Sequence, residues 1–219
     1  MPFLDRAEAG RKLARALASY KDQSPVVLAL PRGGLPVGAE IAAALKAPLD
    51  IVLVRKVGVP YQPELAMGAV VDGGEPITVR NEDVISAAGV SEREFKAACS
   101  RELVEIERRR RLFLGDRRRA EIAGHTAIVT DDGVATGATA RAALRAIRKR
   151  GPKMLVLAVP VAASDTIAEL RSEVDALVCL EAPHRFGAVG SFYADFRQVE
   201  DEEVNAILAR FPVAAPAKA

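Results

Sequence analysis

Two adjacent carboxylates, Asp131 and Asp132, follow the apolar run 127–129 and precede a loop of small residues. The loop ends at Thr139, where a helical pattern begins. The free backbone N–H groups and the positive dipole at the start of a helix suit a phosphate group. Carboxylates repel phosphate oxygens, but they accept hydrogen bonds from sugar hydroxyls. The order of residues therefore fits a ligand that carries a vicinal diol near a phosphate, as in a ribose 5-phosphate.

The alternative interpretation of this stretch is an acidic turn followed by a capped helix. A cap needs one acceptor, whereas the stretch offers two carboxylates and the hydroxyls of Thr136 and Thr139. Gly137 and Ala138 also let the backbone approach a ligand closely. We therefore favour the ligand-binding interpretation.

The same stretch resembles the signature of type I phosphoribosyltransferases, in which an apolar strand, two acidic residues and a Thr-Gly-x-Thr loop follow one another. The resemblance implies that Asp131 and Asp132 hold the ribose hydroxyls of phosphoribosyl pyrophosphate. It also implies that a loop wraps the 5-phosphate, with the residues Val134, Ala135, Thr136, Gly137, Ala138 and Thr139.

A second stretch, LPRGGLPVG at 30–38, follows the first apolar run. The resemblance places the pyrophosphate loop of the family here, with Arg32, Gly33 and Gly34 as contacts, and this loop often carries a non-proline cis peptide bond. Arginine offers forked donors to phosphate oxygens, and adjacent glycines expose backbone N–H groups. Taken alone, a simple strand-to-helix turn would explain the stretch equally well.

Arg55 and Lys56 end another apolar run. The resemblance implies that both neutralise the pyrophosphate and, with Arg32, act as catalytic residues; a solvated strand end is the alternative. The residues 57–66 resemble the flexible hood loop of the family. Some members supply a catalytic lysine from this loop, but here Lys and Arg are absent from 57–79. The polar side chains that remain in the loop are Tyr61, Gln62 and Glu64.

The stretch HRFGAVGSFYADF at 184–196 resembles the region that recognises the base in purine members of the family. It implies that Phe186 stacks on a base and that Val189 offers backbone groups to it. Ordinary core packing is an equal alternative for Phe186, and we favour it for Phe192 and Tyr193.

The fifth position of the acidic loop separates subgroups of the family. Hypoxanthine-guanine members carry an aspartate there, whereas adenine and orotate members carry a small residue; this chain has Ala135. The resemblance therefore leaves the acceptor open, and the nearest likeness is a bacterial subgroup with no assigned acceptor.

The elements that must position these residues alternate along the chain. An amphipathic helix is predicted over 3–20. Apolar runs predict strands at 25–30, 49–54, 67–72, 126–131, 154–160 and 176–180, and helices are predicted at 35–46, 91–115, 137–150 and 165–173. This alternation predicts an α/β fold with a parallel sheet and helices on both faces.

Together with the resemblance, the pattern implies a single type I phosphoribosyltransferase domain over 1–219. A small hood subdomain is expected, to which the N-terminal helix and 181–200 contribute. The tail 212–219 is expected to be frayed.

The implied reaction transfers ribose 5-phosphate from phosphoribosyl pyrophosphate to a nitrogen acceptor, a nucleobase, and releases pyrophosphate. Mg²⁺ is the expected cofactor, held mainly through phosphoribosyl pyrophosphate and water oxygens rather than by protein ligands. His125 and His184 lack metal-ligand spacing and are assigned to structure. A homodimer is compatible with the resemblance.

The rival interpretation is a non-catalytic regulator that senses phosphoribosyl pyrophosphate or a nucleotide and binds nucleic acid through the basic run 107–119. The pairs Glu105–Arg109 and Glu107–Arg111 have i,i+4 spacing, so a solvated helix face is favoured. A dinucleotide-binding oxidoreductase is disfavoured, because no Gly-x-Gly-x-x-Gly follows the first strand.

Composition sets few limits on the partner. The net charge is +2, and half of the 219 residues are hydrophobic. Cys99 and Cys179 do not form a disulfide framework. Neither a signal-peptide core nor an apolar run of membrane-spanning length occurs in the sequence, so a cytoplasmic protein with no membrane partner is expected.

Overall fold

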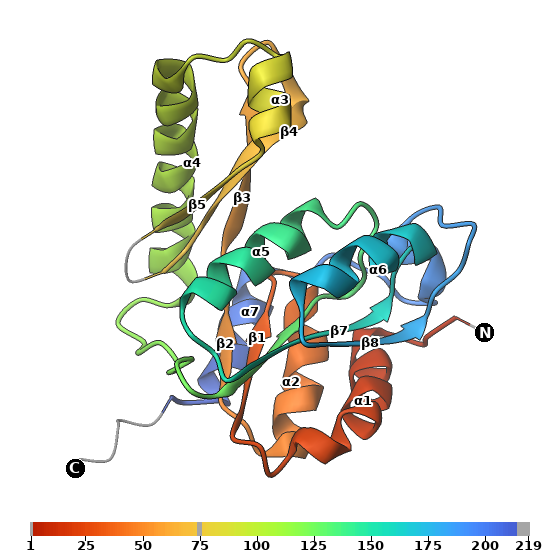
Figure 1. Ribbon diagram of the computed structural model, residues 1–219. Helices are drawn as coiled ribbons and strands as arrows, with labels where there is room; N and C mark the ends of the chain where they lie inside the picture. The colour runs from red at the N-terminus through yellow and green to blue at the C-terminus, as the bar shows by residue number, and fades with distance from the viewer. Residues whose placement is uncertain (1, 74–75, 214–219) are drawn as a thin grey trace.

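The computed structural model describes residues 2–73 and 76–213. Its centre is a parallel sheet of five strands in the order β2-β1-β6-β7-β8 (Figure 1). The strands are β1 (Pro25–Ala29), β2 (Leu49–Ile51), β6 (Thr126–Thr130), β7 (Met154–Val161) and β8 (Ala176–Glu181). The predicted α/β fold with a parallel sheet is confirmed.

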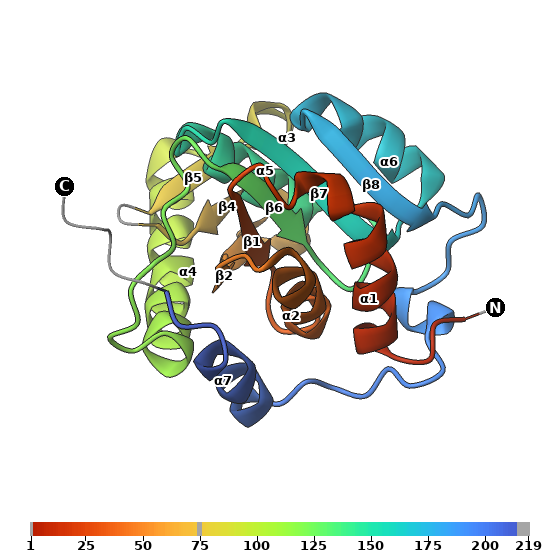
Figure 2. The ribbon, with the colours of Figure 1, turned by 90° about the horizontal axis from the view of Figure 1, so that it is seen from below.

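Helices cover both faces of this sheet (Figure 2). One face carries α1 (Arg6–Ala16), α2 (Gly34–Leu45) and α7 (Asp201–Ala209), and the other carries α5 (Ala138–Lys149) and α6 (Ser164–Leu170). Successive strand residues point to opposite faces, so Val27 and Ala29 enter one apolar core while Val26 and Leu28 enter the other. Burial on both faces explains why these strands read as continuous apolar runs.

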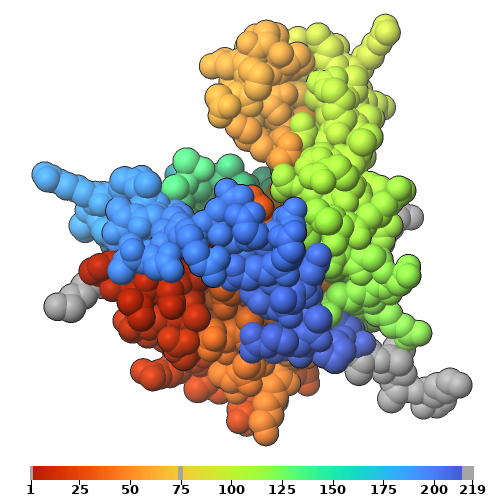
Figure 3. All heavy atoms as spheres, turned by 180° about the vertical axis from the view of Figure 1, so that it is seen from behind, coloured from red at the N-terminus to blue at the C-terminus, as the bar shows by residue number. Residues whose placement is uncertain are grey.

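An arm formed by residues 54–113 projects from this body (Figures 1 and 3). It contains an antiparallel sheet of β3 (Val54–Val59), β4 (Gln62–Val71) and β5 (Ile77–Arg80), backed by α3 (Glu82–Ala87) and α4 (Glu92–Phe113). The helix α4 begins with the expected capping box of Ser91 and Glu94.

The interpretation of 57–66 as a loop is wrong, because most of this segment is paired in the β3–β4 hairpin. The pairing shifts register on both sides of Gly58. A Cβ on Gly58 would stand 2.3 Å from the carbonyl oxygen of Pro63, so only glycine lets the strands approach here. A glycine and a proline that look like loop signals in the sequence therefore mark an irregularity within a hairpin.

The start of the chain lies beside the segment that follows β8, and Phe3 pairs with Tyr193 in a parallel bridge. Figure 3 shows this later segment, in blue, against the N-terminal helix, in red. α1 packs on α2 and on strands β7 and β8. Between 181 and 200 the chain forms one short 3₁₀ helix, η3 (Val189–Phe192). The part of the predicted frayed tail from 214 onward lies outside the described residues.

Within residues 2–73 and 76–213, every helix is too short or too polar to cross a bilayer.

Candidate active site

The acidic pair lies at the carboxyl end of β6, where open parallel sheets bind ligands. Thr130 ends the strand, and the following loop leads to Gly137, which precedes α5 with a positive φ of 74°. A Cβ on Gly137 would stand 2.7 Å from Thr166 Cγ2, so glycine is required by both conformation and space. Within the described residues no side chain caps α5, which leaves its first N–H groups free for an anion.

Gly33 and Gly34 meet the acidic pair across the site. A Cβ on Gly33 would stand 2.0 Å from Asp132 Oδ2, and one on Gly34 would stand 2.8 Å from the Cα of Asp131. The peptide bond between Pro31 and Arg32 is cis, as the resemblance implied. Two segments about a hundred residues apart in sequence thus share one edge of the sheet.

Each carboxylate of the pair has one oxygen engaged. Asp131 Oδ1 accepts from the backbone N–H of Asp132 at 2.8 Å, and Asp132 Oδ2 accepts from Arg6 Nε at 2.8 Å. Burial raises the pKa of both carboxyls, and the charge of Asp132 raises the pKa of Asp131 further. Arg6 acts in the opposite direction on the pKa of Asp132. The arrangement favours a ligand that brings hydrogen-bond donors to the pair.

Arg6 and Tyr193 are two contacts of Asp132 that sequence reasoning missed. The hydroxyl of Tyr193 donates to the carbonyl oxygen of Asp132 at 2.5 Å, and burial raises its pKa, so it remains a donor. The core interpretation of Tyr193 is confirmed, because it packs with Phe3 in a buried cluster. Arg6 lies outside any recognisable motif. The sequence shows only an arginine in the first turn of an amphipathic helix, which otherwise indicates packing against the core.

The predicted base-binding residues, Val189 and Phe186, come from the segment that follows β8. Val189 reaches the loop, since a Cβ on Gly133 would stand 2.5 Å from its Cγ1. Phe186 stacks on Phe192 with ring centroids 5.3 Å apart. Val189 is therefore beside the acidic loop. Phe186 packs against Phe192, which lies in the same 3₁₀ helix as Val189.

The structure separates Arg55 from Lys56. Adjacent strand residues point to opposite faces, and Arg55 Nε contacts Glu102 of α4 at 2.8 Å. Lys56 Nζ instead contacts Glu64 at 3.1 Å and lines a cleft. The resemblance implies that both face the pyrophosphate at the end of the predicted strand 49–54, whereas in the structure both lie within β3. Arg32, the third expected cation, lies 3.4 Å from Asp201 of α7.

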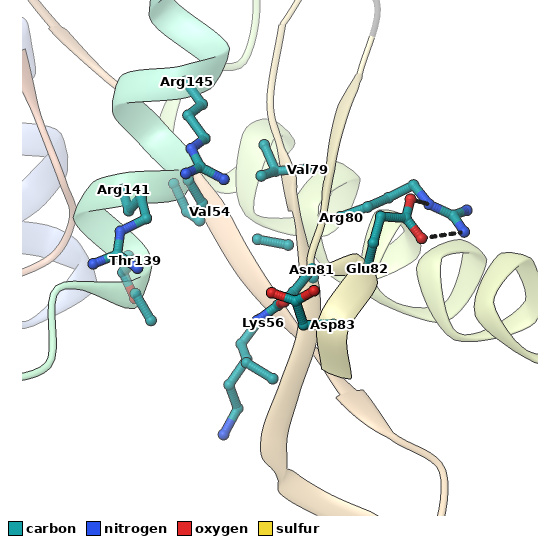
Figure 4. Close-up of a pocket in the computed structure, with 15 residues that line it drawn as sticks. Val54, Lys56, Val79, Arg80, Asn81, Glu82, Asp83, Thr139, Arg141 and Arg145 are labelled. Carbon is teal, nitrogen blue, oxygen red and sulfur yellow. Dashed lines mark hydrogen bonds and ion pairs between the residues drawn. The ribbon is translucent and has the colours of Figure 1, made fainter. Parts of the chain in front are cut away.

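The cleft has a volume of about 460 Å³ and lies between the arm and the start of α5 (Figure 4). It includes Ala138 and Thr139 from the predicted phosphate loop. Arg141 and Arg145 of α5 also line it, paired with Glu169 and Glu173. The cleft therefore places Lys56 on the side of the phosphate loop and on the face of the arm that turns toward α5.

The basic run on α4 is compensated within the helix. Arg108 and Arg109 pair with Glu105, while Arg110 and Arg111 pair with Glu107. These contacts lower the pKa of each glutamate to about 2. The expected i,i+4 pairs are confirmed, and four of the basic side chains are already engaged by carboxylates.

Among the residues that the structure describes, no group of three or more His, Cys, Asp or Glu side chains is arranged to hold a metal ion. His184 Nδ1 lies 3.2 Å from Ser164 Oγ, and His125 Nδ1 lies 3.2 Å from the carbonyl oxygen of Ser24. The acidic pair does not fit a site in which the protein alone holds Mg²⁺.

The family model of the phosphoribosyl transferase domain matches residues 4–197 of this chain. The chain is 45% identical over 208 residues to proteins of two Mycobacterium tuberculosis strains, CDC 1551 and H37Rv, named provisionally as phosphoribosyl transferases. The alignment covers 95% of this chain and 46% of each relative. The crystal structure of TT1426 from Thermus thermophilus matches with a TM-score of 0.83 and 40% identity, over 97% of this chain and 100% of that one.

The chain therefore belongs to the phosphoribosyl transferase family, and its fold is of type I. It spans about half the length of the curated relatives that it matches.

Proposed function

We propose that this chain transfers ribose 5-phosphate from phosphoribosyl pyrophosphate to a ring nitrogen of a nucleobase and releases pyrophosphate. One observation carries the proposal: the acidic pair, the glycines at 33 and 34 and the uncapped start of α5 converge at one edge of the sheet. These three features match, in order, a diol, a pyrophosphate and a phosphate. Their convergence is unexplained if each is a local turn or cap.

The residues divide the ligand among them. Asp131 and Asp132 accept from the ribose hydroxyls, and the N–H groups of 135–139 hold the 5-phosphate. The Val134 N–H already donates to the carbonyl oxygen of Val161 at 2.9 Å. Arg32 and the N–H group of Gly33 hold pyrophosphate. The Gly34 N–H already donates to the carbonyl oxygen of Leu30 at 3.0 Å. Lys56 of the arm lines the cleft that Ala138 and Thr139 of the phosphate loop also line.

Catalysis in this proposal is positioning and electrostatics. As the bond between C1 and the pyrophosphate oxygen breaks, positive charge develops on the ribose and negative charge on the leaving group. In this proposal, the carboxylates lie beside the ribose and the donors lie beside the pyrophosphate. Bound together with phosphoribosyl pyrophosphate and held mainly by ligand and water oxygens, Mg²⁺ would supply charge neutralisation there.

The acceptor approaches from the side of Val189 and Phe186. Position 135 carries alanine instead of a carboxylate. This position therefore offers no base to remove a proton from the acceptor. The proposal therefore favours adenine, or a heterocycle that is already ionised at neutral pH.

The test measures pyrophosphate release from labelled phosphoribosyl pyrophosphate with Mg²⁺ and a panel of nucleobases. The matched control is the Asp131→Asn, Asp132→Asn double variant, which keeps the side-chain shapes. We expect release with at least one base by the wild type and a large loss in the control. Tight phosphoribosyl pyrophosphate binding without release for any base would overturn the enzymatic proposal and favour a sensor.

A further inference from the structure

The Arg6 side chain joins three parts of the molecule. Its Nε donates to Asp132 Oδ2 at 2.8 Å, and its Nη1 donates to the carbonyl oxygen of Arg197 at 2.8 Å. Its Cζ lies 3.9 Å from the ring centroid of Phe196. The side chain is 11% exposed, so this arginine is enclosed by its partners and held in one orientation.

The backbone on either side of Arg6 is fixed as well. Phe3 N–H donates to the carbonyl oxygen of Phe192, and the N–H groups of Ala194 and Asp195 donate to the carbonyl oxygens of Phe3 and Leu4. The Asp5 side chain caps α1 by accepting from Glu8 N–H at 2.7 Å. Because its neighbours are anchored, Arg6 loses little further freedom when it contacts Asp132.

Several groups face the Asp132 carboxylate. They are Asp131 at the end of β6, Arg6 from α1 and the Gly33 backbone. The Tyr193 hydroxyl contacts the backbone carbonyl of Asp132 instead. Among the described residues, Arg6 is the cation paired with this carboxylate. Burial of two neighbouring carboxylates opposes their charge, and the guanidinium compensates for it.

The engaged oxygens leave a specific pair of acceptors. Arg6 occupies Asp132 Oδ2, and the Asp132 N–H occupies Asp131 Oδ1. Asp132 Oδ1 and Asp131 Oδ2 accept no hydrogen bond from the described part of the chain. One oxygen on each carboxylate thus remains for one hydroxyl of a vicinal diol.

We propose that Arg6 is a positioning residue for the ribose diol: it binds one oxygen of Asp132 and so presents the other to a ribose hydroxyl. The inference rests on the proposed function. It assigns a role in ligand binding to the first turn of α1, outside the sequence motifs at 30–38, 127–140 and 184–196. Arg6 acts through Asp132 and is not assigned a contact with the ligand.

The test is calorimetric titration of phosphoribosyl pyrophosphate with Mg²⁺ into purified wild type and variants. We expect Arg6→Met to weaken binding about ten- to a hundredfold, the range for a lost charge-assisted hydrogen bond. Arg6→Lys should recover part of the loss, because it restores the charge without the planar fork. Arg11→Met is the matched control, since Arg11 lies on the same helix and its side chain is 51% exposed.

A merely structural role is separated by a double-mutant cycle with Asp132→Asn. If Arg6 acts through Asp132, Arg6→Met should weaken binding much less in the Asp132→Asn background than in the wild type. Equal losses in both backgrounds, or an unchanged affinity in Arg6→Met, would overturn the inference. If Arg6→Met does not fold, the same cycle is run with Arg6→Lys. A wild type that does not bind phosphoribosyl pyrophosphate would instead overturn the proposed function.

Discussion

Gly33 and Asp132 touch across the candidate site, and a side chain on Gly33 would displace the Asp132 carboxylate. The added Cβ would meet Asp132 Oδ2 at 2.0 Å, which is the movable end of a side chain. At Gly34 the added Cβ would meet backbone, the Asp131 Cα and the Thr130 carbonyl oxygen, both at 2.8 Å. Neighbouring glycines therefore have different consequences when they are substituted.

We predict that Gly33→Ala loses ligand affinity and that Gly34→Ala loses stability. Gly33→Ala should weaken phosphoribosyl pyrophosphate binding about tenfold or more, because Asp132 must rotate away. Gly34→Ala should cost about 1–3 kcal/mol of unfolding free energy, as overpacking against backbone does. Calorimetric titration and thermal denaturation of both variants check this. Equal affinity in Gly33→Ala and wild type would contradict the placement of Asp132 in the binding site.

The second prediction concerns the pH dependence of stability. Burial and the nearby Asp132 raise the pKa of Asp131 well above its ordinary value of 3.8. Its ionisation therefore destabilises the ligand-free fold; this effect is absent below the unfolded-state pKa and complete above the folded-state pKa. We expect Asp131→Asn to raise the Tm at about pH 8 by a few degrees, roughly 2–4 °C per kcal/mol. The gain should shrink as the pH falls toward the ordinary pKa of an aspartate.

The control for this experiment is Asp175→Asn. Hydrogen bonds from Arg148 lower the pKa of Asp175, so its charge stabilises the fold above the unfolded-state pKa, and that contribution is lost on acidification. The two variants should shift the Tm in opposite directions near neutral pH. A lower Tm for Asp131→Asn at every pH would show that the Asp131 charge is not destabilising.

The third prediction separates Arg55 from Lys56. Lys56→Gln and Arg55→Gln each remove one charge from adjacent positions of β3. Lys56→Gln should lower kcat/KM by about tenfold or more, because Lys56 is on the cleft side near the phosphate loop. Arg55→Gln should cost less activity and act on the arm through its pair with Glu102. Steady-state kinetics of both variants check this prediction. Equal losses of kcat/KM would contradict the assignment of Arg55 and Lys56 to opposite faces of β3.

The fourth prediction concerns the acceptor. A carboxylate that manages the acceptor proton contributes typically 10² to 10⁴ in rate, and Ala135 offers none. We therefore expect hypoxanthine and guanine to be poor acceptors relative to adenine or orotate. Turnover should be compared at equal concentrations of each base and of uracil. The highest kcat/KM with hypoxanthine or guanine would mean that another residue supplies the base.

The parts of the site that sequence reasoning predicted are local. The strand, acidic pair, small-residue loop and helix run from 126 to 149 without a break, and each step has its own signal in residue type and spacing. The cis bond at Pro31–Arg32 followed from the resemblance, not from the residues.

The parts that it missed depend on contacts across the fold. Arg6 and Asp132 are 126 positions apart, and nothing near Arg6 in sequence points to a carboxylate. The separation of Arg55 from Lys56 follows from β3 continuing to Val59, which Gly58 and the prolines obscured. Local signals could not show that a strand with a register shift would form there.

The arm and the body share one apolar cluster, in which Ala69 and Val71 of β4 join Ala142 and Ala146 of α5. The boundary of the arm in space therefore differs from its boundary in sequence. A chimaera that exchanges residues 54–113 with those of another family member would leave the incoming strands facing a foreign α5. The helix α5, which begins at the phosphate loop, has to be exchanged together with the arm. The arm and α5 thus evolve as one packing unit, although 24 residues separate Phe113 from Ala138.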